Sequence, residues 1–593
     1  METSVLIAVL AVLIPIIGGP FCYLVEKISP QARTVYAVTL GFITGGLTLA
    51  LIPSITAGTV ESFMWIPGVN ISIGICLDSL SVFVAIVAGC VGSLALLYSA
   101  RYMEHAEGEY SLSRYYWQAL LFIGGMIGLA LTSNLLVMYV FWEIIGFCSY
   151  ALIAYYYHDP EPIPAGTKAF IVTRIGDIGF LTGVLVLWHA TGSLNIFTII
   201  DTASAGLISP LLLGIAGAGF IAGAVGKSAQ FPLHVWLPDA MVAPTTITSL
   251  IHAACLVNAG IYLLGRSYPI FLGLDWWFTA IVWIGAITAF LAATIALTEW
   301  DIKRVLAYST ISQLGYMMAA IGGGALLASQ FHLISHGIFK ALLFLCAGAI
   351  IHATGTKDMR QMGGLRKHMK ITHICSIFGL LSLVGIPIWT GFFSKDMIMA
   401  NLLENGVYGP LVLLIIAAFF TAAYSWRMYW LTFRGDKRSE AKVHEAPWQM
   451  AAPLVVLAIG SISFWLFASP YTSSMVFSLP QYPVEHITLG GLIHHAFASP
   501  IIWVTFVAAV LLAIFTLKWR PTVVNTFTKP SAITLPLREA YWFDTFYNRI
   551  IVRGLFSFWQ WFRRIQTGDL NYNNVGIVVG LILFLVTLFV WGI

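Results

Sequence analysis

Ionisable side chains stand inside stretches of this sequence that are otherwise apolar enough to cross a membrane. They are Glu143, Arg174, Asp177, Lys227, His332, His336, Lys340 and Lys395. A charged group at that depth costs a few kcal/mol, so it needs a partner, water or a function. Because histidine titrates near neutral pH and burial lowers the pKa of lysine towards it, such a set is suited to passing protons.

Three of these groups fall on one face of one predicted helix. In FHLISHGIFKALLF, His332, His336 and Lys340 stand at i, i+4 and i+8, a stripe about 12 Å long. A single buried histidine is usually only a packed core residue. Three ionisable groups in register predict a proton relay.

The remaining charges allow more than one pairing. Glu143 is the sole carboxylate in the apolar stretch FWEIIGFCSY, and Lys227 is the cation that we expect beside it. Arg174 and Asp177 are three residues apart and therefore share a helix face. They either neutralise each other or belong to the path.

Three polar residues near predicted helix ends have simpler interpretations. Asp78, in LDSLS, is either the cap of the helix that it opens or an exit carboxylate. Asp239 and His234 flank a break that follows Lys227, and we expect them to cap backbone groups there.

Nucleotide, metal and redox sites are not predicted. Gly226-Lys227-Ser228 resembles the end of a phosphate-binding loop, but Ile221 stands where that loop needs glycine and no strand precedes it. The seven cysteines are scattered without C-x-x-C spacing. No iron–sulfur cluster, haem, zinc or other cofactor is therefore expected.

The composition predicts an all-α polytopic membrane protein. Of 593 residues, 59% are hydrophobic and only 9% are charged, against roughly 25% charged in soluble domains. The first apolar stretch lacks a basic leader and is interpreted as a membrane helix, not a signal peptide. Runs of spanning length predict about sixteen crossings, near residues 4–24, 34–53, 78–100, 115–132, 135–156, 166–189, 209–237, 245–265, 277–298, 303–321, 326–351, 371–399, 408–432, 449–469, 498–517 and 573–593.

Lysine and arginine are distributed unevenly between the two sides of these crossings. Most of the 30 lie in connections that follow odd-numbered crossings, and the opposite connections hold only Arg266. Positive charge marks the cytoplasmic side, so both termini are predicted on the outer face. The net charge of +4 reflects this topology and does not indicate nucleic-acid binding.

Two blocks of five helices, the fourth to eighth and the ninth to thirteenth, are predicted to be repeats. Because each block has an odd number of crossings, the second is inverted relative to the first. Lys227 and Lys395 fall on the fourth helix of their blocks, and both helices are interrupted. The breaking residues are Pro232 and Pro238 in the first, and Gly385, Pro387 and Gly391 in the second.

A stretch over 539–565 mixes aromatic residues with arginines and predicts an amphipathic lateral helix on the inner surface. At 1.5 Å per residue it reaches about 35–45 Å, long enough to contact a neighbour. The predicted organisation is helices 1–3 (1–110), first repeat (111–270), second repeat (271–435), helices 14 and 15 (436–535), lateral helix (536–570) and final anchor helix (571–593).

Several motifs resemble one family, the antiporter-like membrane subunit L, or ND5, of respiratory complex I. They are LDSLS (77–81), FWEIIGFCSY (141–150), KAFIVTRIGD (168–177), VGKSAQFPLHVWLPDAM (225–241), PTTITSLIHAACLV (244–257), DIKRVLAYSTISQLGYM (301–317), HLISHGIFKALLFLCAG (332–348) and GFFSKDMI (391–398). The lateral helix is short compared with the long form of that family.

The resemblance implies roles for individual residues. It places Glu143, Lys227, Lys340 and Lys395 in a central chain of proton carriers, with His332 and His336 between the lysines. It also implies that Asp177 modulates the first pair. Asp396 matches a family carboxylate at the outward end of the path.

The function that the resemblance implies is proton translocation in a redox-driven pump that uses NADH, F420H2 or ferredoxin and a quinone or phenazine acceptor. The chain would be a non-redox subunit in the cytoplasmic membrane, its lateral helix contacting neighbouring antiporter-like subunits. The alternative is a Na⁺/H⁺ antiporter subunit of an Mrp-type or membrane-bound hydrogenase complex. A non-transporting scaffold is disfavoured by the complete lysine–histidine–lysine series.

Overall fold

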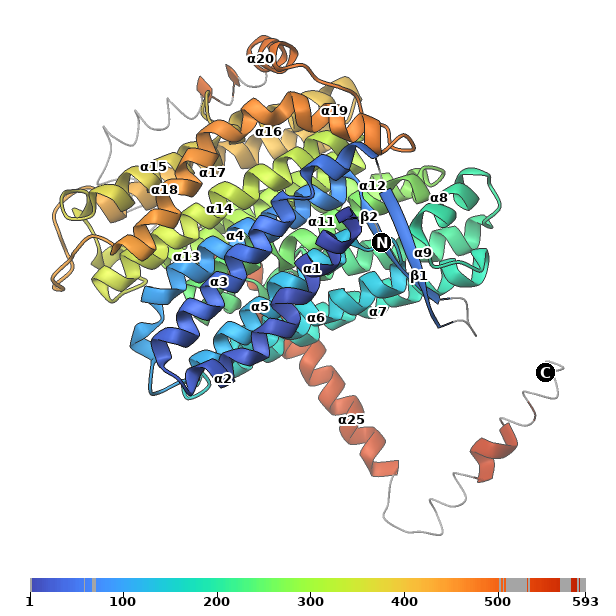
Figure 1. Cartoon of the computed structure of the whole chain (residues 1–593), viewed down its shortest axis with the longest axis horizontal. Coiled ribbons are helices and arrows are strands. Elements are labelled where there is room, and N and C mark those ends of the chain that lie inside the picture. Colours follow the sequence, from blue (N-terminus) through green and yellow to red (C-terminus); the bar gives the residue numbers. More distant parts are fainter. Residues whose placement is uncertain are drawn as a thin grey trace. The chain divides into compact units, whose positions relative to one another are not determined.

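The structure, a computed structural model, describes residues 3–57, 59–66 and 71–500, followed by 503–504, 506–507, 531, 534–565, 578–583 and 586. The chain divides into two compact units, Met1–Lys529 and Pro530–Ile593. The first unit is a bundle of long helices lying side by side (Figure 1).

The first half of this bundle contains nearly all of the predicted fourth to eighth crossings and the helices before them. Its elements are α1 (Thr3–Gly18), α2 (Cys22–Glu26), α3 (Pro30–Leu49), β1 (Thr59–Ile66), β2 (Ile71–Leu77), α4 (Ser79–Tyr102), α5 (Leu112–Leu131), α6 (Leu135–Ile153), α7 (Pro162–Thr191), α8 (Ile196–Ser204), α9 (Pro210–Lys227), α10 (Thr245–Ser249), the π-helix η7 (Leu250–Ala254) and α11 (Leu256–Ser267).

The second half continues with α12 (Asp275–Ala296), α13 (Ile302–Gly322), α14 (Leu326–Thr354), α15 (Lys370–Val384), α16 (Thr390–Glu404), α17 (Tyr408–Phe433), α18 (Trp448–Ser463), α19 (Ala468–Ser478) and α20 (Leu489–Ala498). Among the described residues, 11 helical segments are long and apolar enough to cross a membrane. The multi-span class is therefore confirmed. The predicted crossings at 498–517 and 573–593 lie mostly outside the described residues, so the total of sixteen stays a prediction.

An antiparallel hairpin of β1 and β2 is the exception to the predicted all-α fold. Its register runs from Thr59 opposite Leu77 to Ile66 opposite Ile71. The alternation in ISIGI (71–75) is the period-2 pattern of a strand, but it is too short to stand out among apolar runs. The carbonyl of Gly74 accepts the backbone N–H of Ser133 at 3.0 Å, which ties β2 to the start of α6.

Both helix interruptions lie where proline and glycine predict them. After α9 the backbone forms two short 3₁₀ turns, Leu233–Trp236 and Asp239–Val242, before α10 begins beyond Pro244. In the second half, α15 ends at Val384, the next residue, Gly385, has a φ of +86° that favours glycine, and α16 starts at Thr390.

The ends of two helix pairs match closely in sequence and structure. Asn134 caps α6 and Asp301 caps α13, each accepting the first free backbone N–H groups. Later, α7 and α14 both finish in His-Ala-Thr-Gly, with the glycines Gly192 and Gly355 in the left-handed conformation. After each glycine the chain returns to bond beside the capped start, at Leu194 and Lys357.

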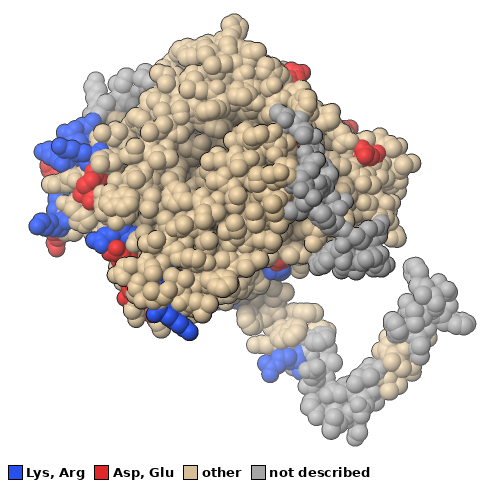
Figure 2. Space-filling view, in the orientation of Figure 1, with Lys and Arg blue, Asp and Glu red and all other residues tan. Residues whose placement is uncertain are grey.

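The most enclosed helices lie at the centre of the bundle. The segment 245–271 is buried along its whole candidate span, and α14 along nearly all of its own. Figure 2 shows Lys and Arg gathered mainly at one end of the first unit, with most of the visible face uncharged. This is the unevenness expected from the sequence.

The second unit contains α23 (Thr534–Arg538), α24 (Phe543–Phe546), a π-helical stretch Tyr547–Val552 and α25 (Arg553–Ile565). Helical backbone is therefore continuous from Phe543 to Ile565, within the predicted lateral helix. Arg549, Arg553 and Arg563 share it with aromatic side chains such as Trp559.

Candidate functional site

Lys227 and Asp177 form a buried ion pair at the end of α9. The Lys227 Nζ lies 3.2 Å from Asp177 Oδ2, and both side chains are fully buried. The other carboxylate oxygen of Asp177 accepts the indole N–H of Trp142 at 2.6 Å. A charge pair at this depth is stable only when its remaining hydrogen-bonding atoms are also satisfied, and Trp142 meets that need for Asp177.

The expected pairing of Glu143 with Lys227 is wrong in this structure. Glu143 instead bonds to Arg174, across the α6–α7 contact. The reason lies in the rotation of α6, which turns Gly146 towards Lys227: a methyl group at that glycine would lie 2.6 Å from the Lys227 amine. Arg174 and Asp177 therefore do not neutralise each other, and each has a partner on another helix.

The Glu143–Arg174 pair lies at the edge of the bundle. The Glu143 side chain is 23% exposed and that of Arg174 is 33% exposed, and the Arg174 guanidinium stacks over Phe170 at 4.5 Å. One oxygen of Glu143 has no protein partner among the described residues. This pair is accessible from outside the bundle, whereas Asp177 and Lys227 are enclosed.

Lys340 lies in the centre of α14 without a carboxylate partner among the described residues. Its amine donates to the Ser309 hydroxyl and, at 3.3 Å, to the carbonyl of Leu306. One turn away, both ring nitrogens of His336 lack a protein partner in the described part of the chain. The rings of His336 and His332 are 6.2 Å apart.

His332 connects this stripe to the second broken helix. Its Nδ1 lies 2.8 Å from the hydroxyl of Ser394, and its Nε2 lies 3.2 Å from Gln313 Oε1. Ser394 directly precedes Lys395, whose amine donates to the carbonyl of Leu383 at 2.5 Å. That carbonyl belongs to the last turn of α15, where a positive charge complements the helix dipole.

Asp396 directly follows Lys395 on α16. Its side chain is buried, with Oδ2 3.5 Å from Nδ1 of His495 on α20. The other nitrogen of His495 is 3.2 Å from Glu404. His495 and Glu404 line a cavity of about 860 Å³, which also contains Glu485 and His486. The imidazole of His495 therefore lies between buried Asp396 and this cavity.

The structure shows the contacts of Asp78 and Asp239, two residues near predicted helix ends. Asp78 caps α4, accepting from Ser81 N at 2.9 Å, and forms a two-pronged buried pair with Arg266 at 2.5 and 2.7 Å. The charge of Arg266 is thereby neutralised by Asp78. Asp239 is not a helix cap, because its carboxylate bonds to Lys168 at 2.6 Å instead.

Three further residues near the site, Trp142, Gln313 and His252, have contacts or surroundings that only the structure shows. Trp142 and Gln313 are ordinary core residue types, and nothing in the sequence marks them as partners of Asp177 and His332. His252, in π-helix η7, stacks against Phe344 at 4.5 Å. Both of its nitrogens lack a protein partner in the described residues, and π-helices are frequent at functional sites.

Within the described residues, no three His, Cys, Asp or Glu side chains are placed to hold a metal ion. The absence of a redox centre or cofactor remains a prediction.

Comparison with known proteins places this site in a family. The pattern described as "NADH:quinone oxidoreductase/Mrp antiporter, TM" matches residues 132–421, and "NADH-Ubiquinone oxidoreductase (complex I), chain 5 N-terminus" matches residues 63–116. The NAD(P)H-quinone oxidoreductase chain 5 of Synechocystis sp. is 38% identical over 545 residues, which cover 82% of this chain and 79% of that relative. The chain belongs to the antiporter-like chain 5 family of complex I.

Two further relatives support the assignment to the chain 5 family. F(420)H(2) dehydrogenase subunit L of Methanosarcina mazei is 39% identical over 466 residues, 72% of this chain and 69% of the relative. The NAD(P)H-quinone oxidoreductase chain 5 of Picosynechococcus sp. is 42% identical over 439 residues, and the chain spans 65% of its length.

Among solved structures, the Mrp complex from Dietzia sp. DQ12-45-1b matches with a TM-score of 0.82 at 26% identity. The alignment covers 100% of this chain and 63% of that one. An archaeal membrane-bound sulfane sulfur reductase matches with a TM-score of 0.79 at 22% identity, which shows the shared fold alone.

Proposed function

We propose that this chain carries protons across the membrane as one subunit of a complex I-type oxidoreductase. The observation that carries the proposal is the buried row that runs from Asp177 and Lys227, through Lys340 and the two histidines, to Lys395. Each group can bind and release a proton, and burial makes the energy of each charged state sensitive to its neighbours.

The matching helix ends support two related halves. Asp177 and Lys340 each stand fifteen residues before the glycine that ends their helix, so they occupy the same position in α7 and α14. One half therefore places a carboxylate where the other places an amine. An inverted arrangement of these halves would align their polar centres near the middle of the bilayer.

The path begins at the Glu143–Arg174 pair. A charge change in an adjoining subunit shifts Arg174, alters the field at Asp177 and changes the proton affinity of Lys227. Separating two charges at about 4 Å in an effective dielectric of 20 involves about 4 kcal/mol. Moving one charge against 150–200 mV requires about 3.5–4.6 kcal/mol. The two energies match in order of magnitude.

The segment 245–271 packs against both α9, which carries Lys227, and α14, which carries Lys340, and it holds polar atoms that lack protein partners. Among the described residues these include Ser249 Oγ, both nitrogens of His252, and Asn258 Oδ1, all on the enclosed segment 245–271. Buried polar groups of this kind are expected to bind water. We propose that hydrated His252 links the two lysines.

From Lys340 the proton passes to His336, His332 and Lys395. The hydroxyl of Ser394, in contact with His332, bridges the last step. Asp396 then accepts the proton and releases it towards the cavity beside His495. Lys340, His336 and His332 lie on successive turns of α14, and Lys395 and Asp396 follow Ser394 directly on α16.

The partners in this proposal are the other membrane-arm subunits, reached in part by the lateral helix, and the surrounding lipid bilayer. Electron transfer takes place on those other subunits, in a complex that uses NADH, F420H2 or ferredoxin. The chain lies in the cytoplasmic membrane with both termini outside and the lateral helix on the cytoplasmic face, as the distribution of basic residues supports.

The second candidate is Na⁺/H⁺ antiport, favoured by the similarity to the Mrp complex structure. The three buried lysines argue against a sodium path, because each protonated amine repels Na⁺.

The two functions are separated by flux measurements on the assembled complex in sealed vesicles. Proton translocation predicts redox-driven acidification of the lumen that persists without Na⁺ and disappears with a protonophore. Loss of the lumenal acidification when Na⁺ is added, with ²²Na⁺ entering the lumen as protons leave and with this uptake abolished by the protonophore, would favour antiport and contradict the proposal.

A further inference from the structure

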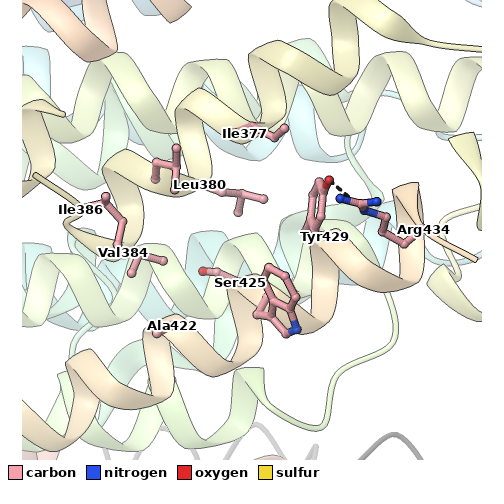
Figure 3. A pocket seen from close by; sticks show the side chains of 10 residues that line it. Ile377, Leu380, Val384, Ile386, Ala422, Ser425, Tyr429 and Arg434 are labelled. Carbon is pink, nitrogen blue, oxygen red and sulfur yellow. Dashed lines mark hydrogen bonds between the residues drawn. The ribbon is translucent and has the colours of Figure 1, made fainter. Parts of the chain in front are cut away.

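An apolar groove lies between α15 and α17 on the surface of the first unit (Figure 3). Its volume is about 310 Å³, and its walls include Ile377, Leu380, Val384, Ile386, Ala422 and Tyr429. The proposed proton path uses none of these side chains. Beside the groove, Ile371, Ile374 and Ile388 are between 41% and 57% exposed, as expected of a surface in contact with lipid chains.

A fixed positive charge closes one end of the groove. Figure 3 shows Arg434 beside Tyr429, where its Nε donates to the phenol oxygen at 3.3 Å. The same oxygen lies 3.1 Å from His373 Nε2, so the phenol is held from both sides. Within the described residues, the terminal nitrogens of Arg434 make no protein hydrogen bond and remain available to an anion.

The surroundings of Arg434 are basic. Arg366 and Lys370 are exposed near the start of α15, and the charge of Arg366 as well as that of Arg434 reaches His373. This is the end of the bundle where positive residues gather. A guanidinium with free terminal nitrogens matches the geometry of a phosphate group.

The length of the groove fits one leaflet of a bilayer. Ala422 and Arg434 are twelve residues apart along α17 and its end, which is about 18 Å at 1.5 Å per residue. Half of a hydrocarbon core of about 30 Å is about 15 Å. An acyl chain that starts at the level of Arg434 would therefore end beside Val384 and Ile386, at the interruption between α15 and α16.

We propose that this groove binds an anionic phospholipid, with its phosphate at Arg434 and one acyl chain along the apolar wall. The chain end then packs against the turn whose neighbouring carbonyl, on Leu383, holds the amine of Lys395. Apolar walls, a basic end and a length of one leaflet together select a lipid over a soluble anion or a polar peptide.

The test measures lipid retained by the full chain, purified in detergent and exchanged into nanodiscs of phosphatidylglycerol or phosphatidylcholine. Native mass spectrometry counts bound lipid after release. Arg434→Gln should weaken retention of phosphatidylglycerol about tenfold, because a charge-assisted contact is lost. Ala422→Trp should displace the acyl chain and abolish retention of the same lipid.

Two matched variants serve as controls. Lys442→Gln removes a positive charge from the same connection away from the groove, and Ala423→Trp adds the same bulk at the next position of α17. Both should retain lipid like the original chain. The proposal is overturned if Arg434→Gln or Ala422→Trp retains phosphatidylglycerol normally, or if phosphatidylcholine binds equally well. Occupation of the groove by a helix of a partner subunit, with no bound lipid, would also overturn it.

Discussion

We expect Asp177 to control the charge state of Lys227, because among the described residues it is the carboxylate that contacts the buried amine. Replacing it with asparagine leaves the amine without a counter-charge, at a cost of about 3–5 kcal/mol if it stays protonated. We expect Asp177→Asn to lower proton transport at least about tenfold. Vesicle acidification measures this, with exposed Asp275→Asn as the control; unchanged transport in Asp177→Asn would show that the pair is only structural.

We expect Trp142 to act through Asp177, as a positioning residue. Its indole N–H bonds to the carboxylate, and a hydrogen bond to a charged group contributes about 1.5–3 kcal/mol. Trp142→Phe keeps an aromatic ring at this position but removes the N–H donor, so the pH profile of transport should shift. Trp188→Phe, at a half-exposed position of α7, should leave the profile unchanged. An unshifted profile in Trp142→Phe would assign the indole to packing alone.

At the scale of elements, the side chain of Lys227 reaches from the end of α9 to the glycine at position 146 of α6. Gly146→Ala places a methyl group 2.6 Å from the Lys227 amine, so the lysine must move away from Asp177. We expect transport to fall about tenfold while the helix itself gains about 1 kcal/mol. The measurements are vesicle acidification and thermal unfolding.

Gly46→Ala in α3 is the matched control, because a methyl group there meets open space. It should retain transport. If Gly146→Ala transports protons as well as Gly46→Ala does, the close contact with Lys227 has no functional role.

The helices and their breaks could be predicted from the sequence because apolar length, proline and glycine act locally. The pairing of the buried charged side chains could not be predicted from the sequence. The pairing of Glu143 with Arg174 depends on how α6 is rotated about its axis, and one turn of difference separates Glu143 from Gly146. The short hairpin β1–β2 was missed for another reason, since its alternation is hidden among longer apolar runs. Trp142 and His495 become visible only when distant segments meet.

At the scale of the whole molecule, the second unit is a separate module with an amphipathic character. Removing residues 530–593 should leave the first unit folded, because the two units are compact in themselves. Association with neighbouring membrane subunits should be lost, since the lateral helix is proposed to contact them. Co-purification with tagged partners measures this, and circular dichroism checks the fold. Full co-purification of the shortened chain would contradict the proposed role.

In the proposed path, Lys340 lies between the Lys227 region and the Lys395 region. Replacing Lys340 with a neutral residue interrupts the row of buried ionisable groups and leaves Lys227 and Lys395 unchanged. Lys340→Met preserves much of the side-chain volume and removes the titratable amine, and exposed Lys367→Met is the matched control.

The most direct test is redox-driven proton uptake by the reconstituted complex that carries each variant. A continuous proton path predicts that Lys340→Met abolishes uptake while the complex remains assembled, and that Lys367→Met pumps normally. Full pumping by Lys340→Met would show that protons cross the membrane by another route.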